Sequence, residues 1–574
     1  MNTAAFDRLR QRFSTLYGPA AVERYLPALQ RKLDKDAAAI QSSLATAQTQ
    51  WDERDHVLIT YGDQVQREGE ATLRTLTDVL VEYGWHESLR TVHLLPCFPY
   101  SSDDGFSVID YRRIDPALGS WEEVRYLRQR FQLMLDFVLN HASSQSAWFQ
   151  SACAGEEPHR DYFLRMPAET PLQQVTRPRS SPLLSPYPGP DGNTEHYWTT
   201  FSADQVDRNY ANPELLLEMI DIMLLYLQQG AHILRLDAIA YLWKELDSSC
   251  VHLPQTHAVV KLLRDVIDYL ELPAWLLTET NVPHQENISY FGQRDEAHMV
   301  YQFSLPPLLL EALLAENASA LNAWLADLQA PPQGCTYFNF TASHDGVGLR
   351  PLEGLLDDAR LAALVKAIKA RDGLASMRRR SDGSESPYEL NVSYVSALSD
   401  IDNPHSEQSV QRFLASQAVM LALQGIPGIY FHSLVGTRND LDGLRASGHA
   451  RHINRHKYQA DELATWLQDP DSAQHRIYRA YQHLLSLRRA QPAFHPDGAQ
   501  HWVDSKHPAL LHFKRLSPDQ TQAIEVVANV SSQPIAYQTG LAGNYRDLIS
   551  NTALSDANWR LGPFQVLWAH LERP

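Results

Sequence analysis

The sequence has few cysteines, and none is spaced as a metal ligand or a redox pair would be. The four, in a chain of 574 residues, are Cys97, Cys153, Cys250 and Cys335, and no two form a C-x-x-C motif. This scatter argues against a disulfide scaffold and against a cysteine zinc site. A Walker loop and a G-x-G-x-x-G motif are also missing, so no nucleotide-binding loop is indicated. We expect neither a metal nor a cofactor.

Positive charge and long apolar runs are equally scarce. The formal net charge is −18, which disfavours a nucleic-acid partner and an anionic membrane surface. No apolar run approaches the roughly 20 residues that span a bilayer, and the N-terminus lacks the basic and apolar segments of a signal sequence. We therefore expect a cytoplasmic protein that acts on small molecules. The sequence leaves open whether it is a monomer or a homodimer.

The sequence does contain enough apolar and aromatic residues for a large interior. Apolar residues make up 44% of the chain, with 12 Trp and 25 Tyr, and its length predicts more than one domain. Residues 1–54 predict an amphipathic helical extension, broken at Gly18-Pro19. Residues 497–574 predict a small antiparallel β-domain with strands at 509–515, 523–529 and 564–569. Three histidines of this domain have no metal-ligand spacing and are expected at the surface: His501, His507 and His512.

Between these two regions, short apolar strands alternate with helical segments such as 215–229 and 257–270. Eight strands with helical crossovers are typical of a (β/α)₈ TIM barrel, which is the predicted fold. Two insertions interrupt it, at 143–210 after the third strand and at 347–405 after the seventh, and would lie on the face where barrel enzymes place their sites. The predicted barrel segments are 55–142, 211–346 and 406–496. The predicted strands are 57–61, 91–96, 133–140, 233–237, 275–279, 299–303, 336–342 and 429–432.

Two charged residues lie within the apolar strand predicted at 233–237. Arg235 and Asp237 are two residues apart, so their side chains share one face of the strand. A buried carboxylate needs a partner, and two interpretations meet that need. Either the pair only stabilises the core, or Arg235 keeps Asp237 ionised at the mouth of the barrel, where it can attack a substrate.

Further ionisable residues stand where other predicted strands end. Glu279 ends the fifth strand and Asp345 follows the seventh, and the third and seventh strands are also followed by His141 and His344. Like charges in one cavity repel, so such a cluster is difficult to explain as structure alone. Retaining cleavage of a glycosidic bond needs two carboxyl groups about 5–5.5 Å apart. Asp237 would be the ionised nucleophile and Glu279 the acid, with a pKa raised by partial burial.

Four stretches in this order resemble the motifs of the α-amylase superfamily of glycoside hydrolases (family 13): 136–141, 235–238, 277–279 and 343–345. Further stretches resemble its sucrose phosphorylase subfamily, namely Asp-Gly-Phe-Ser at 104–107 and the segments 303–310, 344–348, 425–430 and 452–458. Trp-Thr-Thr-Phe-Ser at 198–202, the segment 278–284 and the helical extension are most similar to its branch of glucosylglycerate phosphorylases.

The resemblance implies a role for each matching residue. Asp237 would form a β-glucosyl ester, Glu279 would serve as acid and base, and Asp345 would stabilise the transition state. Asp103 and Arg451 would hold the far end of one glucose unit. Phosphate and the acceptor would alternate near Arg179, Tyr388 and Glu389. Glucose itself would contact His141, Phe201, Arg235, Tyr241 and His344.

The implied activity is reversible phosphorolysis of an α-glucoside to α-glucose 1-phosphate, with 2-O-α-glucosylglycerate as the expected substrate. Two departures argue against sucrose: Glu389 replaces the subfamily's usual Gln, and Ala240 its usual Gly. Arginines concentrated in the two insertions, at 177, 179 and 378–380, suit an anionic ligand. The alternatives are phosphorylases of sucrose, sucrose 6′-phosphate or glucosylglycerol, an α-glucosidase or transglucosidase, and a sugar-binding relative that has lost catalysis.

Overall fold

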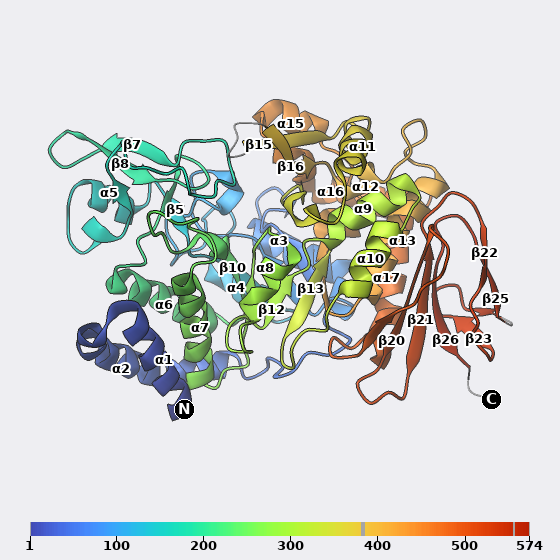
Figure 1. The fold of residues 1–574 in the computed structure, drawn as a ribbon, viewed down its shortest axis with the longest axis horizontal. Coiled ribbons are helices and arrows are strands. Elements are labelled where there is room, and N and C mark those ends of the chain that lie inside the picture. Colours follow the sequence, from blue (N-terminus) through green and yellow to red (C-terminus); the bar gives the residue numbers. More distant parts are fainter. Residues whose placement is uncertain (1, 380–384, 555–556, 573–574) are drawn as a thin grey trace.

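A closed barrel of eight parallel strands forms the centre of the molecule (Figure 1). The computed structural model describes residues 2–379, 385–554 and 557–572. The eight predicted strands are all present, and the predicted TIM barrel is confirmed. Around the barrel the strands are β1 (Val57–Thr60), β3 (Thr91–Leu94), β4 (Gln132–Val138), β10 (Ala231–Asp237), β11 (Trp275–Thr278), β12 (Met299–Tyr301), β13 (Thr336–Phe340) and β17 (Ile426–Tyr430).

The last strand begins earlier than predicted. β17 starts at Ile426 and ends at Tyr430, so the prediction of 429–432 was displaced, and the residues after the strand form the short helix α14 (Phe431–Leu434). Pro427 and Gly428 ordinarily interrupt strands. Here Gly428 is required, because a Cβ at this position would lie 2.4 Å from the ring of Phe338 on β13.

Helices cover the outside of the barrel, and both predicted helices are confirmed. At the start of α6, the side chain of Asn212 accepts a hydrogen bond from the backbone amide of Glu214. Pro213 occupies the first turn of the helix. It ends before Gly230, whose φ of 88° suits glycine. Among the described helices, none combines the length and apolarity of a membrane span. The covering helices include α3 (Thr72–Glu82), α4 (Trp121–Leu127), α6 (Pro213–Gln228), α7 (Pro254–Tyr269), α9 (Leu305–Ala315), α10 (Ser319–Asp327), α13 (Glu407–Ala422) and α17 (Ala473–Arg488).

The N-terminal extension consists of two helices, α1 (Thr3–Tyr17) and α2 (Pro19–Ser43), separated at Gly18 as predicted. They lie at the lower left of Figure 1. α1 packs on α7, where Asp265 is buried. Arg8 Nε lies 2.8 Å from Asp265 Oδ1, and Arg12 Nε lies 2.5 Å from Oδ2. Two arginines thus attach the extension to the barrel wall.

Two insertions lie over the carboxyl ends of the strands, toward the top of Figure 1. The first follows β4 and contains the pair β5 (His141–Ser143) and β9 (Gln205–Asp207). It also contains a sheet of β6 (Arg165–Met166), β8 (Thr194–Trp198) and β7 (Leu184–Pro188). The second insertion follows β13 and forms an antiparallel sheet of β14 (Val347–Gly348), β16 (Glu385–Asn391) and β15 (Leu374–Arg379).

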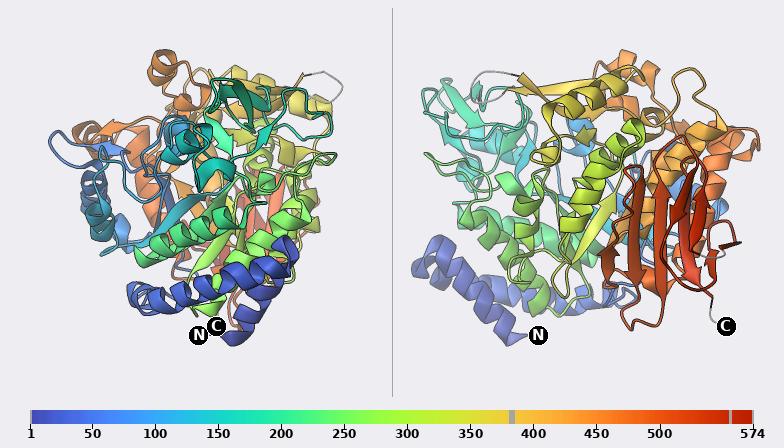
Figure 2. Two further views of the ribbon diagram at one scale, coloured as in Figure 1. Left: turned by 90° about the vertical axis from the view of Figure 1, so that its left-hand side faces the viewer. Right: turned by 45° about the vertical axis from the view of Figure 1, so that its right-hand side comes forward.

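The predicted C-terminal β-domain is confirmed, and it stands beside the barrel in the right-hand view of Figure 2. Its main sheet contains β20 (Leu510–Leu516), β21 (Ala523–Asn529) and β26 (Val566–Leu571), paired antiparallel. The expectation that His512 lies at the surface was wrong. Its Nδ1 is 2.8 Å from the Tyr537 hydroxyl and its Nε2 is 3.1 Å from Glu525 Oε2, both within the domain interior. The alternation of residues along a strand shows which side chains share a face. It does not show that another strand, here the one that carries Tyr537, covers the face with His512.

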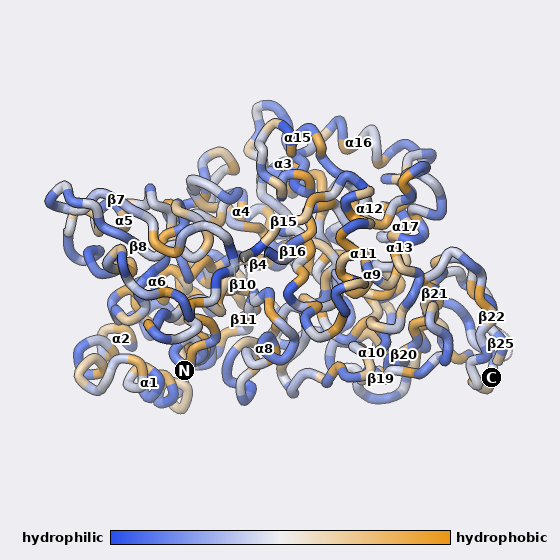
Figure 3. The backbone as a smooth tube through the Cα atoms, turned by 45° about the horizontal axis from the view of Figure 1, so that its top comes forward, coloured by the Kyte–Doolittle hydropathy of each residue, from blue (hydrophilic) through white to orange (hydrophobic). Residues whose placement is uncertain are grey.

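Hydrophobic segments run through the middle of the molecule, and hydrophilic ones lie in the outer loops (Figure 3). The interior nevertheless contains a fully buried arginine, Arg488. Arg488 of α17 donates to the carbonyl oxygens of Leu421 at 2.8 Å and of Gly425 and Phe494 at 3.1 Å. It also donates to the carbonyl of Glu53, before β1. One side chain thereby satisfies four backbone carbonyls, which come from three separate segments of the chain.

We expect Arg488→Met to destabilise the protein by at least about 3 kcal/mol, because each buried carbonyl left without a donor costs about 1–3 kcal/mol. The measurement is the urea midpoint of unfolding. The control is Arg479→Met, at an exposed position of the same helix, which should leave the midpoint unchanged. Equal midpoints for the two variants would contradict the structural role of Arg488.

Candidate active site

Three carboxylates meet at the carboxyl end of the barrel. Asp237 is the last residue of β10, Glu279 follows β11, and Asp345 lies in the loop after β13. All three line one cavity, whose empty space of about 500 Å³ is partly open to solvent. The other residues around it are Asp103, Phe106, His141, Arg179, Phe201, Gln205, Ala238, Asn281, His344, Tyr388, Glu389 and Arg451.

Asp237 and Glu279 lie side by side because their strands are neighbours in the barrel. Leu236 of β10 pairs with Thr278 of β11, so the two carboxylates occupy the next position on each strand. Adjacent strands are about 4.8 Å apart, so the two carboxyl groups are close enough to interact, as the pair of a retaining glycosidase must be. The backbone turns sharply after Asp237. Ala238 has a φ of 48°, a left-handed conformation that places its amide 2.9 Å from Glu279 Oε2.

Arg235 lies beneath the cavity and joins two carboxylates. Its Nη1 is 2.8 Å from Asp237 Oδ1 and also contacts Asp136 Oδ1. The second oxygen of Asp136 is 2.7 Å from Nε2 of His93. The two interpretations of the Arg235–Asp237 pair are therefore compatible, since Arg235 is part of a buried network and Asp237 also faces the cavity.

The environments of Asp237 and Glu279 differ and suit the two carboxyl groups to different roles. Burial raises the pKa of Asp237 and of Glu279, and the negative charge of Asp345 raises that of Glu279 further. Two neighbouring buried carboxylates repel, so the pair holds one proton over a range of pH. Asp237 accepts a charged hydrogen bond from Arg235, whereas Glu279 accepts one from a backbone amide. The charged hydrogen bond favours the anionic form of Asp237, and we therefore expect the shared proton on Glu279.

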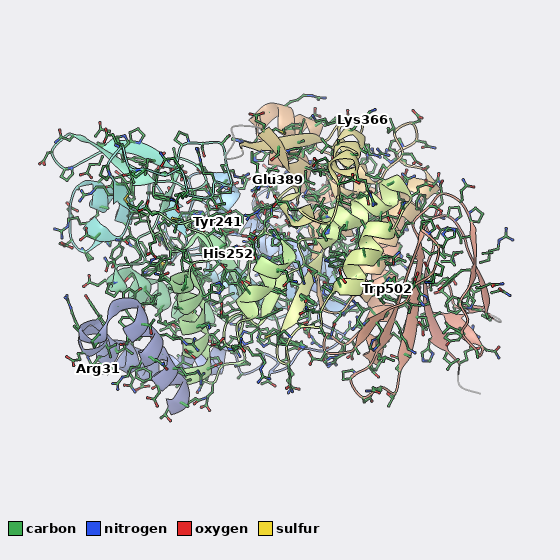
Figure 4. The ribbon with its side chains drawn as sticks, viewed as in Figure 1. Arg31, Tyr241, His252, Lys366, Glu389 and Trp502 are labelled. Carbon is green, nitrogen blue, oxygen red and sulfur yellow. The ribbon has the colours of Figure 1, made fainter. Side chains whose placement is uncertain are left out.

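Asp345 has the opposite environment. Although burial acts against the charged form, Arg451 and Arg455 hold the pKa of Asp345 below its usual range. Arg451 Nη1 lies 2.5 Å from Asp345 Oδ1. The same guanidinium forms a two-point contact with Glu389, at 3.1 Å through Nε and 2.8 Å through Nη2. Glu389, on β16, is labelled in Figure 4. It lines the cavity, and its carboxylate is engaged with Arg451.

Asp103 lies on the same side as Arg451, with Arg451 Nη1 4.0 Å from its Oδ1. Gln205, from the first insertion, donates to Asp103 Oδ2 at 3.3 Å. The neighbouring Asp104 is bound by Arg455 at 2.6 Å and His452 at 2.9 Å. These contacts fix a loop in which Asp103 and Asp104 both have positive φ.

Aromatic rings form another wall of the cavity. Phe201 packs edge-on against His141, at 5.4 Å between ring centroids, and against Tyr241, at 5.5 Å. Burial lowers the pKa of His141 to about 4, so its imidazole is neutral. Phe106 stacks on His344 at 4.6 Å with an interplanar angle of 8°. Tyr241, labelled in Figure 4, lies in the turn that follows β10 and is not among the residues that line the cavity.

Arg179, from the first insertion, also faces the cavity. Its guanidinium lies 5.5 Å from the ring centre of Tyr388, which comes from the second insertion. Within the described part of the chain, no carboxylate forms an ion pair with it. Arg378 instead pairs with Glu353 and is not among the cavity residues, and Arg380 falls outside the described residues. Arg179 is thus a cation at the cavity, and its guanidinium group is available to bind a ligand.

Most of the residues singled out in the sequence line this cavity, while Arg235 lies below it and Tyr241 packs against Phe201. Sequence reasoning missed four neighbours. Phe106 and Asn281 stood within quoted motifs, and Arg455 within 452–458, but no role had been assigned to them. Gln205 carried no signal. Among the described residues, no group of three or more His, Cys, Asp or Glu side chains is arranged to hold a metal ion.

Comparisons with known proteins agree with this geometry. The family model described as alpha amylase, catalytic domain, matches residues 81–345. A glucosylglycerate phosphorylase of Spirochaeta thermophila is 47% identical over 532 residues, 92% of this chain and 89% of the relative. One from Escherichia coli is 43% identical over 523 residues, 90% of this chain and 92% of the relative.

Among solved structures, the crystal structure of sucrose 6F-phosphate phosphorylase from Thermoanaerobacter thermosaccharolyticum has a TM-score of 0.73 at 23% identity. The match covers 84% of this chain and 96% of that chain, and it supports the fold. The expected membership is confirmed by the relatives, whose identity extends over nearly the whole chain. The chain therefore belongs to the α-amylase family, and within it to the group that contains the glucosylglycerate phosphorylases.

Proposed function

We propose that the protein is a retaining glycoside phosphorylase, which converts 2-O-α-glucosylglycerate and phosphate into α-glucose 1-phosphate and glycerate. The relatives that share 43–47% of its sequence bear the name of this activity. The observation that carries the proposal is Arg179, an arginine without a carboxylate partner among the described residues, at a cavity that also contains the paired carboxylates. Arginine forks match phosphate and carboxylate geometry.

In the first step Asp237 attacks the anomeric carbon while the bond to glycerate breaks. Glu279 transfers its proton to the departing oxygen, so glycerate leaves as an alcohol and a β-glucosyl ester of Asp237 remains. The transition state has oxocarbenium character, and the ionised Asp345 stabilises its positive charge. The arginine pairing described above keeps Asp237 and Asp345 charged for these roles.

In the second step phosphate occupies the position that glycerate has left. Glu279, now a carboxylate, accepts a proton from phosphate as a phosphate oxygen attacks the anomeric carbon. The ester bond to Asp237 breaks, and its electron pair returns to the carboxylate. Two inversions give α-glucose 1-phosphate with net retention. Arg179 would bind the carboxylate of glycerate in one half-reaction and phosphate in the other.

The remaining residues hold one glucose unit. Asp103 and Arg451 are 4.0 Å apart and would hold the far end of the glucose ring. His141, Phe201 and Tyr241 form the wall beside the ring, and His344 lies opposite on Phe106. Glu389 and Tyr388 approach from the second insertion, beside the place of the acceptor.

The proposal is tested by incubating the enzyme with α-glucose 1-phosphate and each of glycerate, glycerol, fructose and fructose 6-phosphate, and measuring phosphate release. Glycerate should be the best acceptor. In Arg179→Ala, kcat/KM for glycerate and for phosphate should fall about 10–100-fold, since a charged hydrogen bond contributes about 1.5–3 kcal/mol. Glycerol, which has no carboxylate, should show a much smaller effect.

The matched control is Arg165→Ala, which removes an arginine of the same insertion that is paired with Glu195 at 2.7 Å. Its activity should equal that of the wild type. Release of free glucose without dependence on phosphate would indicate a glucosidase and refute the proposal. A preference for fructose or glycerol would retain the phosphorylase and reject glycerate.

Azide separates the roles of the two carboxylates. With α-glucosyl fluoride as donor, Glu279→Ala should form the glucosyl ester and transfer it to azide as α-glucosyl azide, because two inversions still occur. Asp237→Gly should give β-glucosyl azide by a single inversion. Both variants should lose at least about 10³-fold in phosphorolysis of the glucoside. The same anomer from both variants, assigned by NMR, would contradict the proposed roles.

The pH profile of phosphorolysis should be bell-shaped, and its alkaline limb reports Glu279. Glu279 must be protonated to assist departure of glycerate, so kcat/KM should fall as pH rises through its raised pKa. The charge of Asp345 contributes to that rise, so Asp345→Asn should move the alkaline limb of the residual activity to lower pH. An unmoved limb would show that another group sets it.

A further inference from the structure

A buried ion pair lies behind the aromatic wall and does not line the cavity. Lys244 follows the turn after the nucleophile strand, and Asp207 is the last residue of β9 in the first insertion. The Lys244 side chain is 2% exposed and that of Asp207 is 0% exposed. The two are in direct contact through Nζ and Oδ2. The mechanism above uses neither side chain.

Every donor of this ammonium group has an acceptor. Besides Asp207, Lys244 Nζ is 2.7 Å from Asn140 Oδ1 and 2.6 Å from the carbonyl oxygen of Tyr241. Asp207 in turn accepts from the Thr200 amide at 2.8 Å, from the Thr200 hydroxyl at 2.6 Å and from Asn140 Nδ2 at 3.0 Å. The pair joins four segments: the end of β4, the loop after β8, β9 and the turn after β10.

Each partner of the pair is, or directly precedes, a residue of the aromatic wall. Asn140 precedes His141, Thr200 precedes Phe201, and Tyr241 is itself held by its carbonyl. Phe201 packs between the other two rings. The ion pair thus connects the three segments that carry these side chains to one point in the interior. The contact to Tyr241 also fastens the turn directly after Asp237.

Stability alone does not account for this arrangement. Desolvation offsets the attraction within a buried ion pair, and apolar replacement of both partners is often neutral or stabilising. Burial lowers the pKa of Lys244, although Asp207 acts in the opposite direction. The pair supplies directional hydrogen bonds, which an apolar contact would not. Each of these hydrogen bonds fixes the orientation of one segment.

We propose that Lys244 and Asp207 are positioning residues, which set the aromatic wall formed by His141, Phe201 and Tyr241 at the distance required to bind a single glucose unit. This inference rests on the proposed function in that it takes the wall to be part of the glucose site. It predicts that affinity for a glucose-shaped ligand depends on the pair separately from folding.

The test compares Lys244→Met with the double variant Lys244→Met/Asp207→Asn. The single variant leaves a buried carboxylate unpaired, so both its thermal midpoint and its affinity should fall. The double variant removes both charges and should recover most of the midpoint. Its Kd for 1-deoxynojirimycin, a glucose-shaped cation, should remain about tenfold or more weaker than that of the wild type, equivalent to about 1.4 kcal/mol. Isothermal titration calorimetry measures this Kd.

Recovery of both the midpoint and the affinity in the double variant would show a purely structural pair and overturn the inference. If the double variant does not fold, Thr200→Val provides the test, because it removes one hydroxyl donor to Asp207 and keeps the shape. Its Kd should rise about threefold or more, in line with loss of one hydrogen bond, and an unchanged Kd would overturn the inference.

Lys261→Met is the matched control. Lys261 lies on α7 and contacts Asp295 at 3.4 Å, away from the cavity residues, so its removal should leave the Kd unchanged. The readout needs no phosphate. A wild type that binds 1-deoxynojirimycin but shows no phosphate-dependent turnover would therefore refute the proposed function and leave this inference standing. A wild type that does not bind the ligand would refute this inference.

Discussion

Compensation of buried charge by arginine is the constraint on which the site depends. The cavity is lined by five carboxylates: Asp103, Asp237, Glu279, Asp345 and Glu389. Burial would otherwise protonate such a group, because it penalises the charged form. Arg235 lowers the pKa of Asp237 against the effect of burial, and Arg451 holds the pKa of Asp345 and of Glu389 below the usual range. Among the described residues Glu279 accepts its hydrogen bond from a backbone amide, and its raised pKa suits the acid role proposed for it.

The barrel and its insertions contribute different parts of this arrangement. Asp237 ends one barrel strand and Glu279 directly follows the next, where the hydrogen-bond ladder fixes the backbone, and Asp345 lies in the loop after β13. The groups that would select the ligand, Arg179, Phe201, Tyr388 and Glu389, come from the two insertions. Loops tolerate replacement without disturbing the barrel. The same carboxylate pair can thus serve enzymes that differ in their acceptors.

A strongly acidic chain that binds anions must create positive potential locally. The formal charge of −18 belongs to the whole surface, but the ligand experiences the groups within a few ångströms, because charges beyond about 8–10 Å are screened at physiological ionic strength. Arg179 meets this requirement because no described carboxylate neutralises it. Lys244 illustrates the opposite case, a cation wholly neutralised in the interior, whose use is orientation.

The sequence by itself determined the barrel, its order of strands and helices, and the three carboxylates. Strand ends are encoded locally, by an apolar run that stops at a charged residue, and parallel strands must place those ends on one face. It did not determine that Glu389 engages Arg451, that Gln205 reaches Asp103, that His512 is buried, or that Lys244 and Asp207 support the aromatic wall. These contacts join residues far apart in the chain, and no spacing or periodicity encodes them. Only the folded backbone, which brings both insertions over the same barrel end, decides which side chains meet and therefore which charges are compensated.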